Sequence, residues 1–82
     1  MEELLAILLD IEGFCKNLHY DVVSVGLSGN LYTVKIHTSC EKEECVDEIK
    51  LGLESIGCRA IKLIEILKID RRNYYIILTF RI

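Results

Sequence analysis

The sequence predicts an α+β fold, in which two helices cover one face of a four-stranded antiparallel sheet in the order αββαββ. Apolar residues recur at helical spacing in two segments, and they alternate at strand spacing in the segments that follow each helix. A Gly-Asn turn separates the first two alternating runs. Two helices packed on one face of such a sheet form a two-layer sandwich.

The first helix is predicted over residues 3–18, where apolar residues recur every three or four positions. Residues 4–9 are apolar nearly all round, and such a helix must be covered on every side. Because a chain of 82 residues has little material for this cover, the sequence predicts a homodimer. The expected dimer interface consists of Leu4, Leu5, Leu8 and Leu9. Gly13 is expected to bend or end the helix.

A β-hairpin follows, with strands over residues 20–27 and 31–39 around Ser28-Gly29-Asn30. In the first strand, the alternation places Val23, Val25 and Leu27 on one face. In the second strand, one face carries Tyr32, Val34 and Ile36, and the other carries Thr33, Lys35 and His37.

A second helix is predicted over residues 41–56, with Thr38 or Ser39 as its cap and Gly57 as its end. Residues 59–69 fit helix and strand patterns in part, and their isoleucines favour a strand. The apolar pairs Leu63-Ile64 and Ile66-Leu67 suggest a bulge or burial on both faces. A polar turn over residues 70–73 leads to a last strand over residues 74–82.

The chain is expected to form one domain, residues 1–82, with possible repeat units 1–39 and 40–82. Sliding the chain on itself aligns Cys15 with Cys58 and Asn30 with Asn73. The outer face of the predicted sheet is too apolar for a face left to water and therefore indicates an interface. Its expected members are Thr33, Lys35, His37, Lys62, Ile64, Ile66, Tyr75 and Ile77.

The N-terminal apolar run follows two glutamates, unlike a secretory signal, and is too short to span a membrane. We therefore expect a cytoplasmic protein with no membrane partner and with free thiols, of which Cys40 would be the most reactive. Two alternatives stay open: disulfides, and a zinc site of His37, Cys40 and Cys45. A fourth zinc ligand would come from Cys15, His19 or Cys58. The favoured expectation is no metal and no cofactor.

The sequence contains no glycine-rich phosphate loop, nucleophile elbow or HExxH motif, so we expect no enzyme. Charge is uneven: residues 41–54 carry six acidic and two basic residues, and residues 55–82 carry six basic and two acidic residues. The expected function is a small protein-interaction module, a dimerising regulator or inhibitor that binds another protein. The alternative is a nucleic-acid-binding module that uses the basic C-terminal hairpin; a small-molecule or metal sensor is a weaker third possibility. The expected partner-binding residues are Lys62, Arg71, Arg72 and Tyr75.

Overall fold

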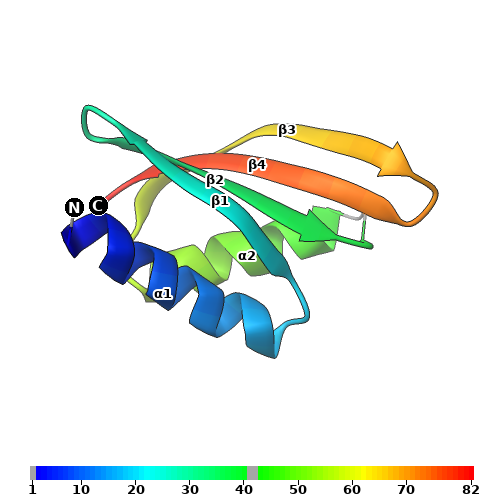
Figure 1. Cartoon of the computed structure of the whole chain (residues 1–82), viewed down its shortest axis with the longest axis horizontal. Coiled ribbons are helices and arrows are strands. Elements are labelled where there is room, and N and C mark those ends of the chain that lie inside the picture. Colours follow the sequence, from blue (N-terminus) through cyan, green and yellow to red (C-terminus); the bar gives the residue numbers. More distant parts are fainter. Residues whose placement is uncertain (1, 41–42) are drawn as a thin grey trace.

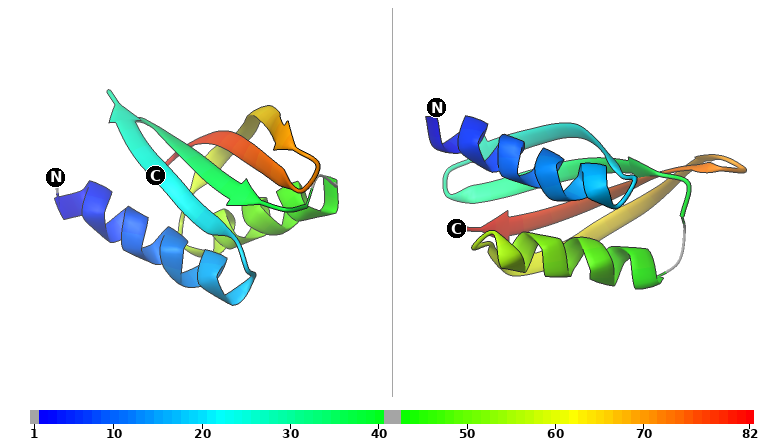
Figure 2. Two further views of the ribbon diagram at one scale, coloured as in Figure 1. Left: turned by 45° about the vertical axis from the view of Figure 1, so that its right-hand side comes forward. Right: turned by 90° about the horizontal axis from the view of Figure 1, so that it is seen from below.

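The structure is a computed structural model that describes residues 2–40 and 43–82, and it confirms the predicted αββαββ order. The sheet order is β1-β2-β4-β3, with antiparallel pairing throughout. Both helices lie on one face of this sheet, so the molecule has two layers (Figures 1 and 2). The elements are α1 (Glu2–Asn17), β1 (Asp21–Ser28), β2 (Leu31–Thr38), α2 (Glu43–Ser55), β3 (Arg59–Asp70) and β4 (Asn73–Arg81).

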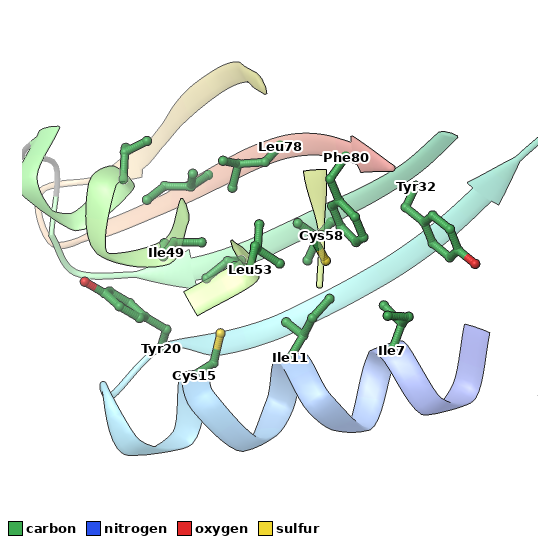
Figure 3. Close-up of a cluster of buried hydrophobic side chains, with 14 residues drawn as sticks. Ile7, Ile11, Cys15, Tyr20, Tyr32, Ile49, Leu53, Cys58, Leu78 and Phe80 are labelled. Atoms are coloured by element: carbon green, nitrogen blue, oxygen red, sulfur yellow. The ribbon is translucent and has the colours of Figure 1, made fainter. Parts of the chain in front are cut away.

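The core lies between the two layers, where side chains of α1 and α2 meet the inner faces of β2 and β4 (Figure 3). Tyr32 and Phe80 face each other across β2 and β4, with their rings stacked at 5.3 Å between centroids. Burial of one large apolar side chain contributes roughly 1.5–3 kcal/mol, so these layers supply most of the driving force for folding. The fully buried members are Ile11, Cys15, Val34, Ile36, Ile49, Leu53, Ile76, Leu78 and Phe80.

Both helices end in a Schellman motif, in which a residue with positive φ lets two amides return to the last turn. Gly57 has a φ of 94°, and the next amide donates to the carbonyl of Leu53. His19 takes the same place after α1 with a φ of 62°, and the amide of Tyr20 donates to the carbonyl of Cys15. The two αββ units therefore share one way of ending a helix.

Three details of the sequence-based prediction need correction. Helix α1 continues through Gly13 to Asn17 without ending there. The aligned cysteines are not equivalent, because Cys15 lies within α1 and Cys58 lies between α2 and β3. A bulge at Val23 breaks the alternation of β1, so Val22 and Val25 both pack on the core. The duplication itself stays a prediction.

Residues 59–70 form a strand and not a helix, as their isoleucine content had favoured. Its register with β4 shifts between Leu63 and Glu65, as the first apolar pair predicts, whereas Ile66 and Leu67 pair regularly. Ile66 faces the helices and packs on the core, so its predicted place on the outer face is wrong. The predicted capping contact between Thr38 and Glu41 involves a residue, Glu41, that lies outside the described part of the chain. The hydroxyl oxygen of Thr38, Oγ1, accepts a hydrogen bond from the backbone amide of Cys40.

Candidate interaction surface

Strand β3 forms one edge of the sheet, and its outer side has no neighbouring strand in the described chain (Figure 1). It has 12 residues, whereas the other edge strand, β1, has 8. Ile64 is 57% exposed and Leu67 is 37% exposed, in addition to exposed Leu63 and Ile69. An edge strand that presents unpaired backbone groups beside apolar side chains is a template for pairing with another polypeptide.

Charged side chains are interspersed among these apolar residues along β3. Lys62 and Lys68 lie on either side of Glu65, and Asp70 ends the strand. Lysine on an edge strand discourages indiscriminate pairing, because an incoming strand must place an acid opposite it. The β3 edge, meaning Lys62–Asp70, therefore combines exposed apolar side chains with charges of both signs.

The outer face of the sheet carries a polar cluster next to this edge. The imidazole of His37 donates from Nε2 to Asn73 Oδ1 at 2.8 Å, and its Nδ1 lies 3.7 Å from Asp21 Oδ2. Lys35 Nζ lies 4.2 Å from the centroid of the Tyr75 ring, and that ring also meets His37 edge-on. Since these groups bind one another, the cluster is a structured patch of the surface.

Asn73 has a fixed orientation in this cluster. Its amide nitrogen donates to both carboxylate oxygens of Asp70, at 2.7 and 2.8 Å, so its Oδ1 is the atom that faces His37. Asp70 also accepts the amide hydrogen of Arg72. These hydrogen bonds, mainly that from the Arg72 amide, hold the pKa of the Asp70 carboxyl below its usual value. The β3–β4 turn is thus closed by one carboxylate.

The structure does not bring the four predicted partner-binding residues together. Arg71 and Arg72 are exposed at the β3–β4 turn, while Lys62 pairs in register with Thr79, farther along the sheet. Tyr75 lies on the outer face under Lys35, so one face of its ring is already occupied. A nucleic-acid base that stacked on that face of the ring, as the alternative function would use it, would have to displace the lysine.

The four predicted dimer-interface leucines divide into two pairs. Leu5 and Leu9 are exposed, the latter by 58%. Leu4 and Leu8 are half-buried, and Leu4 packs against the core of its own chain. The helix is therefore covered on one side by the sheet, and two of the four leucines are available to a partner.

Cys40 and Cys45 form a disulfide, which contradicts the expectation of four free thiols with Cys40 the most reactive. The bond joins Cys40, just after the end of β2, to Cys45 in the first turn of α2, with 6.5 Å between the Cα atoms. It also uses two of the three ligands of the zinc alternative. Among the residues that the structure describes, no three His, Cys, Asp or Glu side chains converge on a metal position.

Cys15 and Cys58 are free thiols buried in the core. Burial raises the pKa of Cys15 to about 12, with a smaller contribution from Asp21. Burial likewise raises the pKa of Cys58 to about 11, with Asp10 adding to it. Because the thiolate is the reactive form, both side chains are chemically inert in the folded protein.

An open hollow of about 610 Å³ lies where α1 leads into β1. Glu12, Lys16, His19 and Asp21, four of its lining residues, are exposed to solvent. This mixture of charges at the surface is not a preorganised ligand site. Within ranges 2–40 and 43–82, no helix combines the length and the apolar character needed to cross a bilayer.

The sequence missed part of this surface. The charged residues interspersed among the apolar ones over 59–70 were a usable signal, but they could not reveal that the strand lies at the edge. Ile64 was expected on an outward face and is indeed exposed. Leu67 and Ile69 were not predicted to belong to the outer face or to a partner-binding site.

Comparison with known proteins gives a fold relationship. No family model matches the chain, and no curated protein matches it. Among solved structures, the crystal structure of the periplasmic domain of XcpY superposes with a TM-score of 0.67. The two share 14% sequence identity over 94% of this chain and 97% of that chain, so they have a similar fold.

This comparison corrects the prediction of a cytoplasmic protein. The domain of similar fold is periplasmic, and the Cys40–Cys45 disulfide is of a kind that is rare in a reducing cytosol. The prediction had rested on the N-terminal residues, which do not report the redox state of the compartment.

Proposed function

We propose that this chain is a non-enzymatic protein-interaction module that works outside the cytoplasm and binds another polypeptide along the β3 edge. The observation that carries the proposal is the 12-residue edge strand with exposed Leu63, Ile64, Leu67 and Ile69. In such binding the main chain provides affinity, and pockets for alternate side chains provide specificity.

The location is supported by two independent features. The Cys40–Cys45 disulfide is stable in an oxidising compartment, and the fold resembles a domain that is periplasmic. The two free thiols are buried, so they do not exchange with the disulfide in the folded chain.

The non-enzymatic character is supported by how the reactive groups are used. His37 is held by Asn73 and lies beside Asp21 on an open face, and Cys15 and Cys58 are buried with raised pKa values. A general acid, base or nucleophile instead needs access to a substrate in a cleft.

Position-specific photo-crosslinking tests the proposal. A benzophenone amino acid replaces Ile64, which lies at the bulge outside the regular β3 ladder, and the protein is irradiated in the extracytoplasmic fraction of its source cells. The same residue at Leu51 on α2, which is also highly exposed, is the matched control. We expect a discrete crosslinked polypeptide from position 64 that is absent from position 51. An absence of crosslinks at position 64, or the same pattern at both positions, contradicts the proposal.

A further inference from the structure

The pairing of β3 with β4 determines which β3 side chains share a face. Glu65 and Leu67 lie opposite Ile77 and Tyr75 on the outer face, and Ile66 lies opposite Ile76 on the helix face. Residues 65–68 pair without interruption, whereas the register shifts on both sides of them. A second strand could therefore pair regularly with this central stretch.

A second copy of the chain is constrained further by symmetry. Two copies that extend one sheet are related by a twofold axis normal to it, which makes β3 antiparallel to its copy. Residues that face each other must then come from the same face of the sheet. Lys62 and Asp70 meet this condition, because their β4 partners Thr79 and Asn73 both belong to the outer-face series of β4.

Charge selects among the positions where the axis could pass through residues 65–68. An axis at Glu65 or at Lys68 sets that charge against its own copy. Because Ile69 is the extra residue at the shift between Lys68 and Asp70, an axis at Leu67 places Glu65 opposite Asp70 of the second copy. This is again a pair of like charges. Like charges directly opposite each other destabilise an antiparallel pair.

An axis at Ile66 has no such conflict. Ile66 meets its own copy on the helix face, and Glu65 lies opposite Leu67 of the second copy. Lys62 lies opposite Asp70 of the second copy, and the symmetry makes this pair twice. Of the axes that pass through the unbroken stretch 65–68, only the one at Ile66 avoids like-charge pairs, and it also brings Lys62 opposite Asp70 at both ends of that stretch.

We propose that the polypeptide that pairs with the β3 edge is a second copy of this chain, in the register centred on Ile66. The result is an eight-stranded antiparallel sheet with all four helices on one face. This inference rests on the proposed function and names the partner for the same edge. The Lys62–Asp70 pairs fix the register, and Ile66 and Leu67 supply the apolar contact.

One other register has complementary charges. With Ile64 as the extra residue of the bulge, an axis at Leu63 would place Lys62 opposite Glu65 of the second copy. That axis lies directly beside the bulge at Ile64, where the strand is not regular. The variant Glu65→Lys distinguishes the two registers. It should weaken dimerisation in the register centred on Leu63, because it removes the Lys62–Glu65 pair, but not in the register centred on Ile66, where Glu65 lies opposite Leu67.

Charge changes on the outer face test the proposal by sedimentation equilibrium of the purified, oxidised protein. Leu67→Glu places a glutamate opposite Glu65 of the other copy, and symmetry makes this like-charge pair twice, so we expect dimerisation to weaken about tenfold. Glu65→Lys alone should change the dimer dissociation constant less than threefold. The double variant Glu65→Lys/Leu67→Glu should restore dimerisation, because each new glutamate then faces a lysine. Circular dichroism of each variant verifies that the monomer remains folded.

Leu9→Glu is the matched control, since it places the same charge on an exposed leucine of α1. We expect no change in dimerisation from it. Loss of the dimer in Leu9→Glu but not in Leu67→Glu overturns the proposal and assigns the interface to α1. Weakening by Glu65→Lys alone overturns the Ile66 register.

Failure of the inference is distinguishable from failure of the proposed function. A wild-type chain that is monomeric at several hundred micromolar, but whose position 64 crosslinks to a different polypeptide, overturns self-association and leaves the function intact. A monomer without crosslinks at position 64 overturns both. A dimer of the expected register whose position 64 crosslinks to its own copy supports both.

Discussion

Gly52 of α2 leaves the space that the ring of Phe14 of α1 occupies. A Cβ atom added at Gly52 would meet two carbons of that ring at contacts too close for any side chain to keep. Helices α1 and α2 approach each other at this point because one of them has no side chain there. Gly13, only one residue before Phe14, has open space at the equivalent position.

Gly52→Ala should therefore destabilise the protein although alanine is the better helix former. Overpacking costs typically 1–3 kcal/mol, which exceeds the gain of about 1 kcal/mol in helix propensity. Gly13→Ala is the control and should stabilise the protein by up to about 1 kcal/mol. Urea unfolding monitored by circular dichroism measures both. Equal stabilisation by the two alanines would show that the Phe14 ring moves freely away from α2.

Reduction of the Cys40–Cys45 disulfide should lower the free energy of unfolding by about 2 kcal/mol. This value follows from the loop-closure entropy of a loop that spans a sequence separation of 5. Unfolding of the wild type with and without reductant measures the effect, and Cys40→Ser/Cys45→Ser should match the reduced wild type. A double variant as stable as the oxidised protein would contradict a stabilising role for the bond.

The buried thiols predict a loss of stability at high pH. The pKa values of Cys15 and Cys58 are raised to about 12 and about 11, from an ordinary value of 9.0. Above pH 9 the unfolded chain loses these protons while the folded chain keeps them, so stability falls as pH rises from 9 towards 12. Thermal unfolding between pH 8 and 11 measures this slope, which Cys15→Ala/Cys58→Ala should make shallower. A slope that the double variant leaves unchanged would assign the alkaline loss to other groups.

His37 should occupy one tautomer when neutral. Since Asn73 presents its oxygen to the ring, Nε2 must carry the hydrogen. Nitrogen chemical shifts of the imidazole report the tautomer directly, and Asn73→Ala should reduce the preference. A neutral His37 protonated at Nδ1 would mean that the 3.7 Å approach to Asp21 controls the ring instead.

Arg71→Ala/Arg72→Ala should leave the free energy of unfolding within about 0.5 kcal/mol, because both side chains are exposed at a turn that the Asp70 carboxylate closes. The same variant separates the two function classes. Titration of the wild type with single-stranded and duplex oligonucleotides should show no binding. Salt-sensitive binding that the two alanines abolish would instead favour the nucleic-acid alternative.

The sequence alone determined the elements and most of the core. Alternation in 31–38 and 73–81 was strict enough to assign Tyr32, Val34, Ile36, Ile76 and Leu78 to the inner face, because a strand that is half-buried repeats every second residue. Gly57 marked the end of α2 because a Schellman motif favours glycine at that φ. The same motif after α1 could not be predicted from the sequence, because histidine, unlike glycine, does not indicate a positive φ at position 19.

Tertiary structure decided what depends on neighbours that are distant in the chain. The bulge at Val23 inverts part of β1, and no local pattern reports an extra residue in a strand. The order β1-β2-β4-β3 makes β3 an edge, although its isoleucines and leucines would suit a central strand equally well. The pairing of Cys40 with Cys45 depends on where the chain turns between β2 and α2, because a disulfide requires two Cα atoms within bonding reach and not a sequence motif.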